Sequence, residues 1–188
     1  KRYGMPLYRW LELQILGAVL RLSMAYADVV AVESYSSIKY VPWFYRRKGV
    51  VSYNGMDEEV EYASRSPKSE TGRAVCVGVQ PYKCVDVSIE VFLKARGLYA
   101  LRSLEVIGGH GMLRRFECFG VDYSGEISRN RVLQSLSGAV LYISSTAIEN
   151  SFNAAAEGVL LAKASLISDI PVHRELCEVL GADFREFT

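Results

Sequence analysis

The sequence is poor in the residue patterns that bind metal ions. It contains no Asp-x-Asp pair, and its two histidines, His110 and His173, lie far apart. The four cysteines have no spacing typical of metal ligands; they are Cys76, Cys84, Cys118 and Cys177. We therefore expect no metal site, no Ser/His/Asp catalytic set, and reduced thiols of the kind found in cytoplasmic proteins. Cys76 and Cys118 fall in strand-like runs and are expected as small core residues.

An excess of charge of either sign is also absent. The formal net charge is +1, which argues against a protein that binds nucleic acid through bulk electrostatic attraction. The charge is uneven, because residues 1–48 carry eight Lys/Arg and three Asp/Glu, whereas residues 49–70 carry two and five. A solvated surface explains this pattern, and an acidic partner or a membrane surface is the alternative.

No apolar run is long and uninterrupted enough to predict a membrane-spanning helix. The longest covers residues 11–32 and contains Glu12, Arg21 and Asp28. Each of these charges would cost about 2.5–3.5 kcal/mol at the centre of a bilayer. We expect instead a helix over residues 9–27 and a short strand at 29–32. Because the sequence does not begin with Met, we also expect it to be part of a longer protein.

Further along the chain, short apolar runs alternate with helical patterns, which predicts an α/β fold: a Rossmann-like parallel sheet with flanking helices. Residues 34–47 are predicted as a helix that Pro42 interrupts, and residues 58–71 as a loop. Strands are expected at 50–53, 73–79, 103–109, 116–120, 139–143 and 164–168, and helices at 85–95, 127–136, 153–162 and 172–180.

Because ligands bind at the carboxyl ends of the strands in open α/β sheets, the candidate site should lie in the loops that follow them. The first such loop has Gly78, where the backbone can approach a ligand closely, and Lys83 five residues later. The helix expected at 85–95 would add its positive N-terminus, a combination suited to a diphosphate. An ordinary turn with a surface lysine is the alternative.

The segment SSTAIENSFNAAAEG, residues 144–158, holds two glutamates, Glu149 and Glu157, eight positions apart. They would not stack on one continuous helix. If Glu149 lies in the loop and Asn153 caps the helix, Glu157 lies about one turn inside it, and both acids can face the strand ends. The alternative is a helix with an acidic start and a small-residue packing face.

Read in order, the motifs resemble those of family 4, or group 1, glycosyltransferases, which have the GT-B fold of two Rossmann-like domains. The resemblance covers most of the chain from about Asp28 onward, and the two-glutamate spacing E-x7-E is its most specific element. The motifs are NGMD (54–57), GVQPYKCVD (78–86), LEVIGG (104–109), ENSFNAAAE (149–157) and SDIPVHREL (168–176).

The resemblance implies that Lys83 contacts the donor diphosphate, Glu149 the hydroxyls of the transferred sugar, and Glu157 the ribose of the nucleotide. Lys83 and Glu149 are the implied catalytic residues. The family's usual arginine after Gly78 is replaced by Val79. The implied donor-binding set is Gly78, Val79, Lys83, Gly108, Gly109, Glu149, Asn150, Ser151, Phe152, Asn153 and Glu157.

The resemblance also divides the chain. Residues 1–48 are expected as the remnant of an N-terminal acceptor domain, and residues 49–188 as a C-terminally incomplete donor-binding domain. The implied activity is retaining, metal-independent transfer of a sugar from a nucleotide diphosphate sugar to a glycan or lipid-linked acceptor, without a cofactor. A nucleotide-sugar-binding module without catalysis and a sugar-nucleotide epimerase remain as alternatives. Peripheral membrane association of the full-length protein and a homodimer through residues 1–48 remain open, and no nucleic-acid partner is expected.

Overall fold

The computed structural model describes residues 7–64, 72–97, 101–109 and 119–181. The chain divides into two compact units, Lys1–Tyr53 and Asn54–Thr188. The division falls five residues later than the boundary expected from the sequence, because strand β2 (Gly49–Val51) pairs with β1 (Val30–Val32) of the first unit.

The first unit consists of a long helix and a two-stranded parallel sheet. Helix α1 (Leu7–Tyr26) buries none of its residues. Lys48 closes its C-terminal end, since its ammonium donates to the carbonyl oxygens of Ala25 and Ala27 at 3.1 and 2.7 Å. Among the described residues, no helix combines the length and the apolar character that crossing a membrane requires.

The helix expected over residues 34–47 is replaced by two short 3-10 segments, η1 (Tyr35–Tyr40) and η2 (Arg46–Lys48). Pro42 explains the interruption, because a proline disfavours helical backbone in the residue before it. Val41 indeed has extended dihedrals, with φ −69° and ψ 128°. Ser34 begins the first segment by accepting a hydrogen bond from the Ser37 amide at 3.1 Å.

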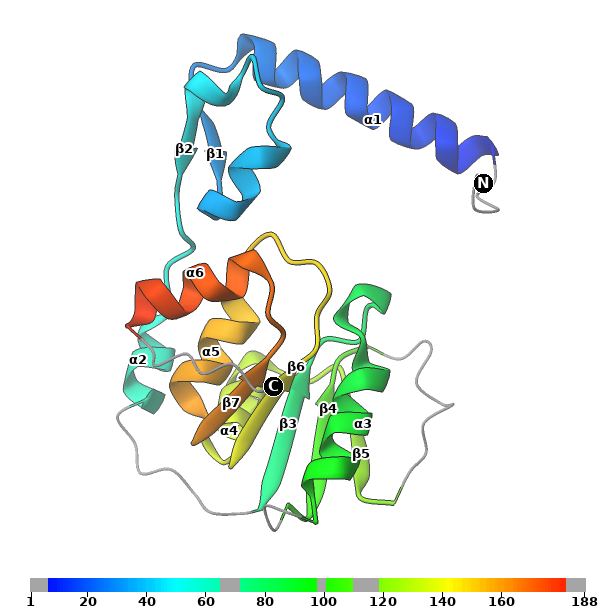
Figure 1. The fold of residues 1–188 in the computed structure, drawn as a ribbon, viewed down its shortest axis with the longest axis vertical. Helices are drawn as coiled ribbons and strands as arrows, with labels where there is room; N and C mark the ends of the chain where they lie inside the picture. The colour runs from blue at the N-terminus through cyan, green and yellow to red at the C-terminus, as the bar shows by residue number, and fades with distance from the viewer. Residues whose placement is uncertain (1–6, 65–71, 98–100, 110–118, 182–188) are drawn as a thin grey trace. The chain divides into compact units, whose positions relative to one another are not determined.

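The second unit has a five-stranded sheet in the order β5-β4-β3-β6-β7, with all described pairs parallel (Figure 1). The predicted Rossmann-like fold class is therefore confirmed. The strands are β3 (Arg73–Val77), β4 (Ser103–Ile107), β5 (Val121–Gly125), β6 (Leu141–Ser144) and β7 (Ala164–Ile167). The helices are α2 (Glu58–Ser64), α3 (Val85–Ala95), α4 (Arg129–Ser137), α5 (Asn153–Leu161) and α6 (Pro171–Leu180), with a 3-10 turn η3 at Pro81–Lys83.

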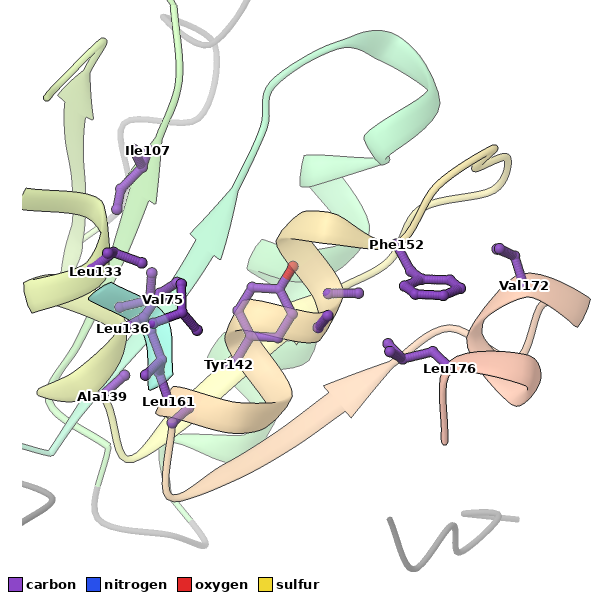
Figure 2. Close-up of a cluster of buried hydrophobic side chains, with 14 residues drawn as sticks. Val75, Ile107, Leu133, Leu136, Ala139, Tyr142, Phe152, Leu161, Val172 and Leu176 are labelled. Carbon is purple, nitrogen blue, oxygen red and sulfur yellow. The ribbon is translucent and has the colours of Figure 1, made fainter. Parts of the chain in front are cut away.

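Alternating side chains of the strands build a core on each face of this sheet. On β3, Ala74 and Cys76 belong to a core cluster with residues of α3, whereas Val75 belongs to a larger cluster with residues of α2, α4, α5 and α6. Tyr142 of β6 belongs to the larger cluster, and in the view of Figure 2 its ring lies between Val75 and Phe152. Both faces are covered, as expected for a parallel sheet.

Helix α5 approaches the sheet unusually closely. A Cβ atom built on Gly158 would lie 2.2–2.5 Å from three atoms of the Tyr142 ring. The glycine is therefore required for space, because no side chain fits between this helix turn and β6.

Two further sequence predictions about elements were wrong. The strand expected at 116–120 is found at 121–125; residues 116–118 lie outside the described chain, and Phe119 and Gly120 form a turn, with φ +85° at the glycine. The segment 58–71, expected as a loop, contains helix α2, whose Val60 is 1% exposed in the core. Its first turn is acidic, which stabilises a helix N-terminus.

Candidate functional site

The sheet has a topological switch point between β3 and β6. From β3 the chain proceeds outward through β4 and β5, and β6 then returns to the opposite side of β3. At such a point, neighbouring strands send their following segments in opposite directions and leave a crevice at their carboxyl ends. The segments concerned, residues 78–84 and 145–152, contain Lys83 and Glu149.

The Lys83 side chain packs over Gly78, which has no side chain of its own. The φ of Gly78 is +96°, a region that residues with a side chain rarely adopt. A Cβ at this position would lie 3.3 Å from both Cγ and Cε of Lys83. The lysine chain therefore runs directly over the glycine, and the turn η3 leads from there to the N-terminus of α3.

Hydrogen bonds fasten the segment after β6 to the segment after β3. The Ala147 amide donates to the carbonyl oxygen of Tyr82 at 2.8 Å, and the Thr146 hydroxyl lies within hydrogen-bond distance of the Tyr82 and Ile148 carbonyl oxygens, at 3.2 and 3.0 Å. The Ser168 hydroxyl donates in turn to the Thr146 carbonyl at 2.6 Å. Because Thr146 is almost fully buried, these bonds set the backbone spacing between the two segments.

Lys83 and Glu149 form an ion pair at this switch point, in which the ammonium donates to the Glu149 carboxylate. Their side chains are 13% and 18% exposed. The sequence placed both residues at the strand ends, and the structure brings them into contact. Each retains hydrogen-bonding capacity, because an ammonium has three donors and a carboxylate accepts several bonds. The pair can thus receive an anion and a hydroxyl group side by side.

Glu157 lies in the second turn of α5, and its side chain is 8% exposed. Arg129, the first residue of α4, donates to its Oε2 at 2.6 Å and to Oδ2 of Asp57 at 3.1 Å. The pKa of Arg129 is raised above its ordinary value, chiefly by the hydrogen bond to Glu157. Sequence reasoning did not single out Arg129; its place directly after β5, at the carboxyl edge of the sheet, was the signal available.

The other predicted donor-binding residues occupy the same edge in different ways. Val79 packs over Gly108, where a Cβ would lie 2.9 Å from its Cγ1. Gly109 follows with no atom within 4 Å of such a Cβ. Asn150 is exposed and Ser151 is half-buried, both in the segment that leads to α5.

One expectation about the start of α5 needs correction. Phe152, not Asn153, is the N-cap residue, and no side-chain hydrogen bond caps the helix. The Phe152 ring is 7% exposed and packs in the core cluster that contains Val172 (Figure 2). Most of the Phe152 surface is therefore taken up by packing in the core.

His173 of α6 is fully buried close to this edge. Its Nδ1 donates to the Ser168 carbonyl oxygen at 2.8 Å, since a carbonyl only accepts. Its Nε2 is buried without a partner among the described residues. Burial lowers the pKa of His173, while the charges of Glu149 and Lys83 act on it in opposite directions. His110 lies outside the described residues.

The cysteines of the described chain are free thiols. Cys76 is buried, as the sequence predicted, and burial raises its pKa to about 11. Cys118 lies outside the described residues. Within the described chain, no group of three or more His, Cys, Asp or Glu side chains is arranged to hold a metal ion.

No protein-family profile and no curated protein sequence matches the chain. Solved structures do. The chain is similar to WaaG, a glycosyltransferase involved in lipopolysaccharide biosynthesis, with a TM-score of 0.57 and 16% identity over 80% of this chain and 52% of WaaG. It is similar to Anabaena HepE, solved in complex with UDP and glucose, with a TM-score of 0.58 and 13% identity over 88% of this chain and 56% of HepE.

A third neighbour is a UDP-forming trehalose-phosphate synthase from Burkholderia xenovorans, with a TM-score of 0.52 and 11% identity over 76% of this chain and 46% of the synthase. The chain thus spans about half the length of these three proteins. At such low identity the likeness concerns the fold, and the Rossmann-like unit of this protein has the fold found in GT-B glycosyltransferases.

Proposed function

We propose that the Rossmann-like unit binds the nucleotide diphosphate sugar donor of a glycosyltransferase. The observation that carries the proposal is the meeting of Lys83 and Glu149 at the switch point between β3 and β6. This position is where open parallel sheets bind nucleotides. The fold neighbours are glycosyltransferases, and HepE was solved with UDP and glucose, which is the ligand class proposed here.

The diphosphate would bind at Lys83 and the N-terminus of α3. A helix N-terminus has unsatisfied amides and a positive partial charge, and α3 begins two residues after Lys83. The ammonium would donate to a phosphate oxygen with one of the donors that its bond to Glu149 leaves available. With Val79 where an arginine is usual, Lys83 is the cation that we assign to the diphosphate.

Glu149 would then accept hydrogen bonds from hydroxyls of the transferred sugar, and Glu157 from the hydroxyls of the ribose. The two carboxylates fit these separate roles because Glu149 lies in the segment before α5 and Glu157 one to two turns inside it. A carboxylate that accepts two neighbouring hydroxyls selects a polyol over an unsubstituted ring.

In the proposed reaction, the bond between the anomeric carbon of the sugar and the diphosphate oxygen breaks, and the electron pair leaves with the nucleotide diphosphate. An acceptor hydroxyl oxygen bonds to the same carbon, and its proton passes to the departing diphosphate. Lys83 and the α3 amides would stabilise the negative charge that develops on the leaving diphosphate. We propose a retaining reaction without a metal ion, in which the acceptor is a glycan or a lipid-linked sugar.

A binding module without catalysis is the second candidate. The valine at position 79 favours this candidate. Without an arginine there, the segment between β3 and α3 offers the diphosphate one side-chain cation, Lys83, instead of two. Transfer of sugar by the full-length protein separates the two candidates.

A thermal-shift panel of UDP, GDP and their common sugar conjugates tests donor binding. A ligand present at one hundred times its dissociation constant should stabilise the folded protein by about 2.7 kcal/mol. Nucleoside monophosphates are the control, since they lack the second phosphate of the diphosphate group that Lys83 would bind. If no diphosphate nucleotide raises the melting temperature above that of the control, the proposal is wrong.

A further inference from the structure

Arg129 connects three segments of the Rossmann-like unit that are far apart in sequence. It lies at the start of α4, and its guanidinium donates to Glu157 of α5 at 2.6 Å and to Asp57, just before α2, at 3.1 Å. The two bonds leave from different terminal nitrogens, Nη1 and Nη2, so the planar group is held from two directions.

This arrangement differs from an ordinary surface ion pair because of where its members lie. The Glu157 side chain is 8% exposed, whereas Arg129 and Asp57 are 42% and 66% exposed. A nearly buried carboxylate that keeps a single fixed partner has its orientation set by that partner. Arg129 binds Oε2 of Glu157, and no described residue binds Oε1.

We propose that Arg129 is a positioning residue that aims Glu157 at the ribose of the bound nucleotide. The inference rests on the proposed function, since it takes Glu157 as the ribose-binding group. Arg129 holds Oε2, and Oε1 is left to accept the 2′- and 3′-hydroxyl hydrogens. Asp57 holds the other side of the guanidinium, so the segment that enters α2 contributes to the same orientation.

Charge and helix geometry support this assignment. The Arg129 guanidinium is a permanent cation, as arginine is in proteins generally, and its hydrogen bond to Glu157 places this charge beside the carboxylate. The turn of α5 that carries Glu157 packs closely on the sheet, because a Cβ atom on the next residue, Gly158, would already clash with the Tyr142 ring. With the helix held in place, the Glu157 carboxylate can still rotate about its side-chain bonds, and the hydrogen bond from Arg129 restricts this rotation.

The test measures the affinity for UDP or GDP, whichever binds the parent protein more tightly, and for the 2′,3′-dideoxy form of the same nucleotide. The parent should prefer the hydroxylated nucleotide by about tenfold or more, the typical effect of hydrogen bonds to a charged group. Arg129→Gln should reduce this preference severalfold by weakening the binding of the hydroxylated form, with little effect on the dideoxy form. Arg129→Lys, which keeps the charge near Glu157, should restore part of the preference.

Arg131→Gln is the matched control, because Arg131 is an exposed arginine on the same helix. It should leave both affinities unchanged. Circular dichroism confirms that each variant is folded. Equal weakening of both nucleotides by Arg129→Gln, or no weakening of either, would overturn the positioning role. If the parent itself does not distinguish the two nucleotides, the ribose role of Glu157 in the proposed function is wrong, and the inference is lost with it.

Discussion

The close contact between α5 and the sheet makes Gly158→Ala a quantitative test of the fold around Glu157. An alanine Cβ would lie 2.2–2.5 Å from the Tyr142 ring, whereas carbon atoms in contact are about 3.5–4.0 Å apart. The helix or the ring must therefore shift by more than about 1 Å. Tyr142 is 1% exposed and enclosed by the core, so its ring has little room to yield.

Overpacking of this kind costs about 1–3 kcal/mol, and we expect the upper end because the clash involves three ring atoms. Alanine recovers about 1 kcal/mol through its higher helix propensity. The expected net loss is about 2 kcal/mol in the free energy of unfolding, measured by urea denaturation followed by circular dichroism.

Gly97→Ala is the control within the same unit, because no atom lies within 4 Å of its Cβ position. It should change the stability by no more than about 0.5 kcal/mol. Since α5 also carries Glu157, Gly158→Ala should weaken nucleotide binding as well. A Gly158→Ala variant as stable as the parent would refute the packing described for α5.

Three further predictions concern the site. Glu149→Gln should weaken binding of the sugar-bearing donor, which loses a hydrogen-bond acceptor for its sugar, but should not weaken binding of the free nucleotide. Glu157→Gln should weaken the binding of both ligands by about tenfold or more in calorimetry. Equal effects of the two variants would contradict separate roles for the two glutamates. Donor titrations with EDTA and with Mg²⁺ should overlay, and a difference of more than about tenfold would show that a metal takes part. The unfolding free energy should fall as the pH falls below the ordinary histidine value of 6.5, by at most about 1.4 kcal/mol per pH unit, because burial keeps His173 neutral in the folded state while the unfolded chain binds a proton. His173→Asn, whose amide still donates to the Ser168 carbonyl, should flatten this slope, and a slope equal to that of the parent would exclude His173 as its source.

The order of strands and helices in the Rossmann-like unit was predictable because its periodicity is regular. Helix α3 begins and ends at the residues expected, and β3, β6 and β7 lie within two residues of their predicted positions. The placement of Lys83 and Glu149 at one edge of the sheet was also predicted, since parallel strands have their carboxyl ends at the same edge. The sequence does not reveal that the two side chains form an ion pair with each other.

Other features depend on tertiary contacts that no local pattern records. Helix α2 has seven residues in a polar segment, and it is stabilised by the burial of Val60 against the core. Phe152 belongs to the candidate ligand-binding motif, and its packing in a core cluster with residues of α6 is not evident from that motif. The role of Arg129 follows from the meeting of α2, α4 and α5, which only the folded chain brings together.

The most direct test of the account is the affinity of Lys83→Ala for UDP or GDP, measured by calorimetry. We expect a ten- to hundredfold loss relative to the parent, equivalent to about 1.5–3 kcal/mol for a hydrogen bond to a charged group. Lys94→Ala removes the same charge from an exposed position of α3 and should bind like the parent. The double variant with Glu149→Gln shows whether the loss comes from the absent ammonium or from the unpaired carboxylate. If Lys83→Ala binds the nucleotide as tightly as the parent does, the diphosphate is not held at the switch point, and the proposed donor site is wrong.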